Sequence, residues 1–216
     1  MMYEVLASSS KGNAVVIGDE FKGSILIDVG VPYKTIKERV KHLLLVLVTH
    51  RHFDHFNRAT IKKLATERPM LRFATPKWLV EDLLNCGVVK TQIDVVECGQ
   101  RLTYTKGLKI CAHEVPHNVP NVAWEIWLDG ESALYATDCN DVNHIDAPSF
   151  SLYLIESNFG ESEIKERIKA KEESGESHIY EYDVINNHLS HEKCSEFLLK
   201  NMGTNSKYHL LHQHGG

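Results

Sequence analysis

The sequence predicts a fold of mixed α and β type, in which helices cover the outer faces of sheets. Three observations lead to this prediction. Strand-like segments precede helix-like segments in two similar passes along the chain. The middle of the chain, residues 93–137, contains several short strand-like segments. One segment, 42–48, is almost entirely Leu and Val, which is typical of a strand buried on both faces.

The first pass contains the longest apolar strand and the clearest helix signals. Asn57 is a suitable N-cap for a helix that Pro69 would end. Pro76 and Gly87 have the residue types expected near the start and just after the end of a second helix. A further short helix is expected at 32–40. Strands are expected at 5–7, 14–18, 24–28, 42–48 and 71–74.

The second pass begins in the region of short strands. Asp129-Gly130 lies between two strand-like segments and is a strong signal for a hairpin turn. Residues 161–174 form a highly charged segment that predicts a largely solvated helix. Ser190 is a suitable N-cap for a last helix that Gly203 would end. Strands are expected at 93–97, 101–104, 108–114, 122–128, 132–137, 151–156 and 207–211.

Composition predicts one globular domain over residues 1–216. Apolar residues make up 43% and charged residues 25% of the chain, which argues against extensive disorder. The net charge of -5 argues against coating nucleic acid by bulk charge. No apolar run is long enough for a membrane span, and the N-terminus lacks the pattern of a secretory signal. An odd number of cysteines, five, without a CxxC pair favours the reducing cytoplasm.

The chain is rich in histidine, with 13 residues, and three of them lie in one short segment. This segment, 49–55, has the sequence THRHFDH and directly follows the apolar strand. Alternate side chains of an extended segment point the same way, so His50 and His52 can reach one ion together. After a turn, Asp54 and His55 can face a second ion. Imidazole and carboxylate are ligands that borderline divalent metals accept.

The segment HRHFDH resembles the HxHxDH motif of the metallo-β-lactamase-fold hydrolases. Further landmarks of that family follow in the expected order over nearly the whole chain. ILIDVG at 25–30 resembles the first strand that ends in Asp and Gly. PHN at 116–118 resembles the isolated histidine of the first metal site, and YATD at 135–138 resembles the segment of the bridging aspartate. LLH at 210–212 resembles the strand-end histidine of the second metal site.

The resemblance implies a four-layer αβ/βα sandwich of two packed sheets and a site with two divalent ions. His50, His52 and His117 would hold one ion, and Asp54, His55 and His212 the other, with Asp138 bridging them. His214 is the alternative to His212. We prefer His212, because it directly follows an apolar strand. Zinc is the expected metal, and manganese is the alternative for the same nitrogen and oxygen ligands.

Three further segments resemble the YycJ-like and tRNase Z-like phosphodiesterase branch of the family. NHLS at 187–190 resembles the element whose histidine donates a proton to the leaving oxygen, which implies this role for His188. IESNF at 155–159 resembles the segment whose glutamate orients that histidine, which implies this role for Glu156. SSSKGN at 8–13 resembles a loop near the N-terminus of YycJ-like proteins. Asp54, His188 and Glu156 are therefore the predicted catalytic residues.

These assignments predict a phosphodiesterase that hydrolyses a nucleotide phosphodiester bond by a metal-bound hydroxide with a histidine general acid. The substrate is a nucleic-acid strand or a cyclic nucleotide, as in phage proteins that degrade cyclic-nucleotide defence signals. We favour the cyclic nucleotide, because the chain is short and acidic and no sequence remains for the long RNA-binding arm of tRNase Z. The location would then be the cytoplasm, or the host cytoplasm for a phage-encoded protein. Relatives suggest a homodimer.

Other classes make different demands on the residues. A hydrolase of a lactam, lactone or thioester would use the same metals but would not need His188. A flavodiiron-type redox protein would need an acidic residue at position 52, where this chain has His. Basic side chains at positions 11, 51 and 58 can contact a phosphate of either proposed substrate, the cyclic nucleotide or the nucleic-acid strand.

Overall fold

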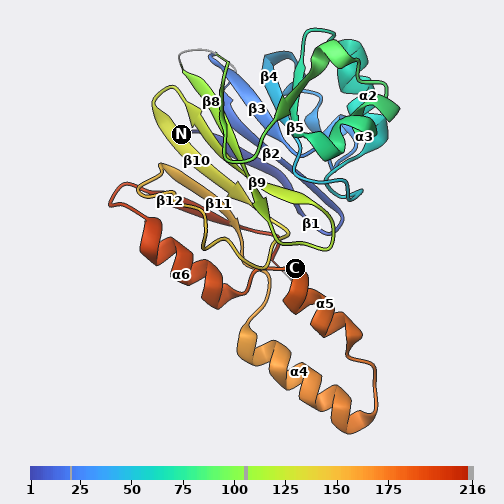
Figure 1. Ribbon diagram of the computed structural model, residues 1–216, viewed down its shortest axis with the longest axis vertical. Helices are drawn as coiled ribbons and strands as arrows, with labels where there is room; N and C mark the ends of the chain where they lie inside the picture. The colour runs from blue at the N-terminus through green and yellow to red at the C-terminus, as the bar shows by residue number, and fades with distance from the viewer. Residues whose placement is uncertain (20, 105–106, 214–216) are drawn as a thin grey trace. The chain divides into compact units, whose positions relative to one another are not determined.

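The computed structural model describes residues 1–19, 21–104 and 107–213 (Figure 1). The chain divides into two compact units. The first comprises Met1–Ala112 with Ile126–Gly130, and the second comprises His113–Glu125 with Glu131–Gly216. The prediction of one domain over 1–216 stays a prediction. Two mixed sheets of six strands each, together with helices, confirm the mixed α and β fold that the sequence predicts.

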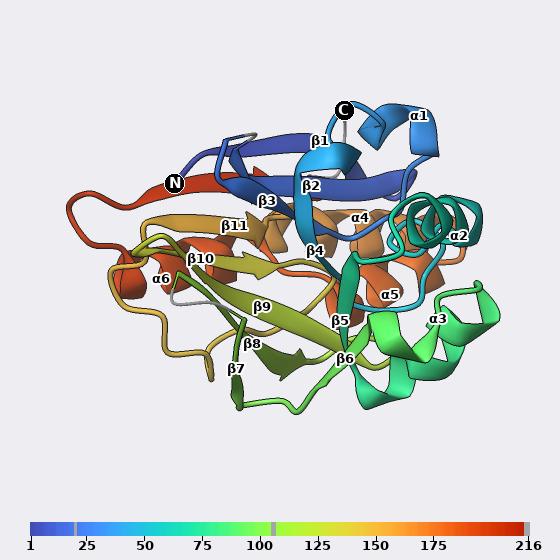
Figure 2. The same cartoon turned by 90° about the horizontal axis from the view of Figure 1, so that it is seen from above.

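The first sheet belongs to the first unit and has the order β1-β2-β3-β4-β5-β6. β1, β2 and β3 pair antiparallel, whereas β3, β4, β5 and β6 pair parallel. The parallel strands β3, β4 and β5 lie next to one another in Figure 2. Their carboxyl ends therefore share one edge of the sheet, which brings the residues that follow β3 and β4 together. The bounds are β1 Tyr3–Ser9, β2 Gly12–Asp19, β3 Gly23–Ile27, β4 Leu43–Leu47, β5 Arg72–Pro76 and β6 Ile93–Val96.

Helix α2 (Arg58–Glu67) begins where the sequence predicts it. The side chain of Asn57 accepts a hydrogen bond from the Thr60 backbone N–H at 3.0 Å, which is the expected N-cap. The predicted helix over 32–40 is wrong in its length, because it splits into α1 (Tyr33–Ile36) and the 3-10 turn η1 (Val40–His42). Only one residue of each piece is buried, so a long apolar face to hold a continuous helix is missing. The remaining elements are η2 Lys77–Leu79, α3 Val80–Asn85 and η3 Lys90–Gln92.

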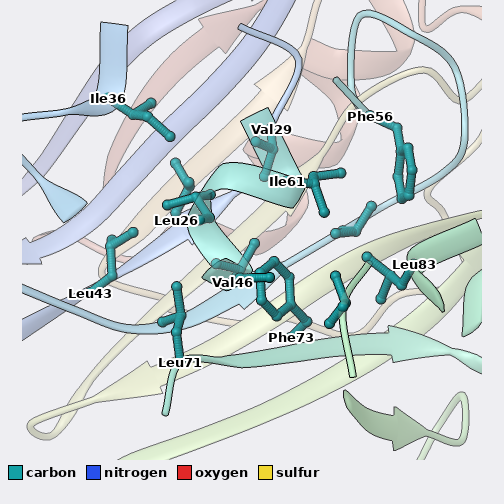
Figure 3. Packing of buried hydrophobic residues seen from close by; sticks show 14 of the residues in the cluster. Leu26, Val29, Ile36, Leu43, Val46, Phe56, Ile61, Leu71, Phe73 and Leu83 are labelled. Atoms are coloured by element: carbon teal, nitrogen blue, oxygen red, sulfur yellow. The ribbon is translucent and has the colours of Figure 1, made fainter. Parts of the chain in front are cut away.

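The core of the first unit joins these helices to the sheet (Figure 3). Leu26 and Val46 come from neighbouring strands, Phe73 from β5, and Ile61 from α2. Phe56, which directly follows the histidine-rich segment, is also part of this cluster. The core thus fixes both ends of that segment, because strand β4 precedes it and Phe56 ends it.

The second sheet has the order β12-β11-β10-β9-β8-β7. β10, β11 and β12 pair parallel, so their carboxyl ends also share one edge. Asp129 and Gly130 both have positive φ, 52° and 85°, as a two-residue hairpin turn requires. The bounds are β7 Arg101–Thr103, β8 Leu108–Val115, β9 Asn121–Leu128, β10 Glu131–Ala136, β11 Leu152–Glu156 and β12 Lys207–Leu211.

The described part of the second unit contains three helices. The predicted helices are found as α4 (Glu161–Ser174) and α6 (His191–Asn201), the latter capped by Ser190. Helix α5 (Ile179–Asn187) is not predicted, because its β-branched and aromatic residues have modest helix propensity. It runs beside α4 (Figure 1), and an ion pair of 2.8 Å between Lys171 and Glu181 joins the two helices. Helix α5 ends directly before His188, so this unpredicted helix positions a predicted catalytic residue.

Candidate metal centre

Three of the residues at strand ends have a backbone conformation that non-glycine residues rarely adopt. Asp28 directly follows β3, Asp138 lies just beyond β10, and His212 directly follows β12. Their φ angles are 59°, 52° and 48°. A non-glycine residue in this conformation destabilises the fold by about 1–3 kcal/mol, and such residues are concentrated at functional sites. The strand ends of both sheets are therefore candidates for function.

In the first unit, His50 and His52 bring two ring nitrogens close together. Nε2 of His50 lies 3.1 Å from Nδ1 of His52. Two imidazole nitrogens at about 2.0–2.1 Å from one tetrahedral ion are about 3.3 Å apart. The observed separation fits two ligands of one ion, as the alternation of the segment predicts.

A buried carboxylate orients the other nitrogens of this cluster. Asp28 accepts hydrogen bonds from the Thr49 backbone N–H at 2.9 Å and the Thr49 hydroxyl at 2.9 Å, and from Nδ1 of His55 at 2.7 Å. Because the Thr49 hydroxyl proton points to Asp28, its oxygen accepts from Nδ1 of His50 at 3.0 Å. Both histidines therefore have Nδ1 protonated and present Nε2 as the atom that can bind a metal.

Asn13, near the start of β2, holds Asp54 and His55 in place. The Asn13 backbone N–H donates to the Asp54 carbonyl at 2.6 Å. The Asn13 amide nitrogen lies 2.8 Å from Nε2 of His55 and 3.4 Å from the Asp54 carboxylate. The segment that resembles the YycJ-like loop thus contacts the histidine-rich segment directly.

In the second unit, Glu156 is the centre of a second cluster. One of its oxygens lies 2.7 Å from Nδ1 of His188 and 3.1 Å from Nδ1 of His212. Its other oxygen accepts from the backbone N–H groups of Cys139 at 3.1 Å and Leu189 at 3.3 Å. With both oxygens engaged, this fully buried carboxylate is suited to orient the two imidazoles.

Asp138 contacts the same two histidines. Its carboxylate lies 2.8 Å from Nδ1 of His212 and 3.3 Å from Nδ1 of His188. Burial lowers the pKa of both histidines, but the hydrogen bonds and charges of Asp138 and Glu156 outweigh it. They raise the pKa of His188 to about 10 and that of His212 to about 9. The four side chains together offer ligand atoms within 4.8 Å of one another.

His117 belongs to the same unit and is oriented by helix α5. Its Nδ1 donates to the backbone carbonyl of Asn187 at 3.2 Å, which leaves Nε2 as the possible ligand atom. His188 directly follows Asn187, and the ring centroids of His117 and His188 lie 6.0 Å apart. The C-terminal end of α5 therefore fixes both His117 and His188.

The predicted site residues thus form two groups. The first unit brings together His50, His52, Asp54 and His55, and the second brings together His117, Asp138, Glu156, His188 and His212. His214, the alternative final ligand, lies outside the described residues. Sequence reasoning missed the orienting residues Asp28, Thr49 and Asn13. A signal existed for Asp28 and Asn13, since each lies in a segment that resembles a family landmark.

A family model matches most of the chain. The model of the "Beta-lactamase superfamily domain" matches residues 26–179. The chain belongs to the β-lactamase superfamily. No curated protein matches the sequence.

Solved structures with the same fold cover almost the entire chain. The metallo-β-lactamase fold protein YhfI from Bacillus subtilis has a TM-score of 0.72 at 15% identity, over 99% of this chain and 87% of that one. Human tRNase Z, short form (ELAC1), has a TM-score of 0.70 at 15% identity, over 99% and 92%. A diphosphatase from the PhnP family has a TM-score of 0.67 at 14% identity, over 98% and 85%. These similarities confirm the metallo-β-lactamase fold that the resemblance predicts.

Superfamily membership and the two clusters support a metal-dependent hydrolase. The side chains fit such a metal, because they offer imidazole nitrogens and carboxylate oxygens. The Nδ1 atoms are already engaged in hydrogen bonds in His50, His55, His117 and His212. Among the described residues, no helix has the length and apolar character needed to cross a membrane.

Proposed function

We propose that the protein is a phosphodiesterase with two divalent metal ions, acting on a nucleotide substrate. In this proposal His50, His52 and His117 would hold one ion, Asp54, His55 and His212 would hold the other, and Asp138 would contribute to both sites. The assignment combines residues of both units and rests on the family resemblance. Zinc is the proposed metal, and manganese fits the same ligands.

The observation that carries the proposal is the pair of Glu156 and His188. The 2.7 Å contact holds Nδ1 of His188, and the two backbone N–H groups on the other oxygen fix the carboxylate itself. His188 is only partly buried, so its Nε2 edge can reach a substrate. This arrangement suits the delivery of one proton to a leaving oxygen.

Bound divalent ions would lower the pKa of water and offset the charge of the phosphate. Asp54 would orient the attacking water, which would release one proton to solvent as its oxygen forms the new bond to phosphorus. The bond from phosphorus to the leaving oxygen breaks, and that oxygen takes a proton from His188. Glu156 would hold the imidazole in position during this transfer. The leaving group departs as a neutral alcohol, which removes the cost of releasing an alkoxide.

The proposed substrate is a cyclic nucleotide or a nucleic-acid strand. Two of the structural neighbours are a tRNase Z and a diphosphatase, which supports phosphate-ester chemistry. The net charge of -5 favours the small substrate over a long polyanion. A cytoplasmic location and a homodimer belong to the same proposal.

The test is metal analysis of the purified protein followed by assays on a panel of substrates. The panel contains a cyclic mononucleotide, single-stranded DNA, single-stranded RNA and bis(p-nitrophenyl) phosphate, together with a lactam, a lactone and a thioester. The proposal predicts two equivalents of metal per chain and hydrolysis of at least one of the phosphodiesters in the panel. Hydrolysis restricted to the lactam, lactone or thioester would refute it.

The second candidate is a hydrolase of a lactam, lactone or thioester, which the same metal ligands would serve. The two candidates differ in their need for His188. The His178→Ala variant is a suitable control, because His178 lies before α5 and packs on Tyr182 at a ring distance of 5.3 Å. Loss of activity in His188→Ala but not in His178→Ala supports the phosphodiesterase.

A further inference from the structure

Phe53 in the histidine-rich segment and Phe56 directly after it have opposite surroundings. Phe56 is 3% exposed and packs in the core of the first unit (Figure 3). Phe53 is 76% exposed, although it lies only three residues earlier. The fold therefore uses one of the two rings and leaves the other on the surface.

Backbone contacts, within the turn and to neighbouring segments, hold the turn around Phe53. The N–H groups of His55 and Phe56 donate to the His52 carbonyl at 2.9 and 2.8 Å. The Asp54 carbonyl accepts from the Asn13 backbone at 2.6 Å. It also lies so close to Gly30 that a Cβ there would come within 1.6 Å of it, so only glycine fits. The backbone is therefore anchored on both sides of Phe53, and the Phe53 side chain lies on the surface.

Exposure alone says little, since isolated apolar residues are common on protein surfaces. Phe21, for example, is 89% exposed in the turn between β2 and β3. Phe53 differs in its position, because it lies directly between His52 and Asp54. Its Cα is about 3.8 Å from the Cα of each of these proposed metal ligands. A rigid turn thus presents an aromatic ring beside the place where the phosphate would bind.

We propose that Phe53 stacks on a nucleobase of the substrate and so contributes to substrate selection. The proposal rests on the proposed nucleotide substrate. Every nucleobase has a flat face, and removal of one stacking ring weakens nucleotide binding by about 5- to 150-fold. Arg51, exposed in the same segment, adds a positive charge suited to a phosphate.

The first test measures binding of 2-aminopurine riboside 5′-monophosphate, which contains no phosphodiester bond, to the metal-loaded protein. Stacking quenches its fluorescence, so the same titration gives the Kd and reports the contact. Phe53→Ala should raise the Kd about 5- to 150-fold and remove the quenching. Phe53→Trp should retain both, and Phe21→Ala, the matched exposed control, should behave as the wild type.

Two results of this titration would overturn the inference. One is a wild-type protein that does not bind the nucleotide, or a Phe53→Ala variant that binds it equally well. The other is a Phe53→Leu variant with the affinity and quenching of the wild type, because it would identify an apolar contact without stacking. An acyl substrate, for example, would need only such a contact.

The second test compares hydrolysis of a dinucleotide with that of the same compound lacking the base nearest the cleaved bond. Phe53→Ala should raise KM for the first by the same factor while kcat stays within about twofold. It should leave KM for the abasic compound unchanged. Equal effects on both compounds would refute the stacking role. Failure of the proposed function would look different, since the wild type itself would then hydrolyse no phosphodiester.

Discussion

The two clusters of site residues are organised by carboxylates in different ways. In the first unit, Asp28 holds His55 directly and His50 through the Thr49 hydroxyl, and each of these contacts is a separate hydrogen bond. In the second unit, Asp138 and Glu156 both contact the Nδ1 atoms of His188 and His212. The first arrangement sets ring orientation, and the second couples charge among four side chains.

This difference predicts different consequences of mutation. Loss of an orienting carboxylate in the first unit should weaken metal binding, because the affected histidines are proposed ligands only. Loss of Glu156 in the second unit should reduce turnover more than metal content, because one of its histidines is the proposed acid. The following experiments test this contrast.

The largest effect is expected for Glu156→Gln. The two backbone N–H groups of Cys139 and Leu189 favour the amide oxygen on their side, so the NH₂ group faces the histidines and can no longer accept from His188. We expect kcat to fall about hundredfold (~2.7 kcal/mol). KM and metal content should stay near the wild-type values, because Asp138 still lies 2.8 Å from Nδ1 of the proposed ligand His212 and can accept its proton. Steady-state kinetics and metal analysis measure this split.

Glu125→Gln is the matched control for that variant. Glu125 is another buried glutamate of the second unit, at 3.3 Å from His113. Its substitution should leave kcat nearly unchanged. Parallel losses of kcat and metal in Glu156→Gln would instead indicate a structural role and contradict the account.

A smaller effect on the other unit is expected for Asp28→Asn. The Thr49 backbone N–H keeps the amide oxygen on its side, so the NH₂ group turns toward Nδ1 of His55. His55 must then carry its proton on Nε2, the atom proposed to bind metal. Metal affinity should fall about 10- to 100-fold, as is typical for loss of such an orienting partner.

Competition with a chelator of known affinity measures this change. Asp146→Asn is the control, since Asp146 is exposed and lies outside both clusters. If Asp28→Asn retained wild-type metal affinity but lost turnover, the proposed contrast between the units would be wrong.

The smallest effects are expected at the helix caps next to the two clusters. Asn57 caps α2 and Ser190 caps α6, each by accepting a backbone N–H, at 3.0 and 3.1 Å. Alanine at either position should lower the free energy of unfolding by about 0.5–2 kcal/mol. Urea denaturation measures this loss, and metal content under native conditions should stay unchanged. A loss of metal in either variant would show that the cap also supports the ligands.

The sequence was most informative where the signal is local. The histidine-rich segment places three imidazoles and a carboxylate within six residues, and Asn57 and Ser190 mark helix starts by their own side chains. The parallel edge of β10, β11 and β12 explains why Asp138, Glu156 and His212 meet, although they lie far apart in the sequence. The family resemblance predicts part of this grouping, since it places Asp138 with His212 at the metals and Glu156 beside His188.

The features that the sequence did not reveal depend on distant contacts. Asp28 acts on His55, 27 residues away, and Asn13 on Asp54, 41 residues away. Helix α5 has little propensity of its own and depends on its burial and on its contacts with α4. The exposure of Phe53 is likewise a property of the folded turn, because the same residue type three positions later is buried.

The central claim is that His188, oriented by Glu156, protonates the leaving oxygen. Its most direct test compares kcat of the wild type and His188→Ala on two phosphodiesters, one with an alcohol leaving group and one with p-nitrophenol. We predict a loss of about 10²- to 10⁴-fold for the alcohol and a much smaller loss for p-nitrophenol, which leaves without protonation. Metal content should stay unchanged. Equal losses on both substrates would contradict the claim.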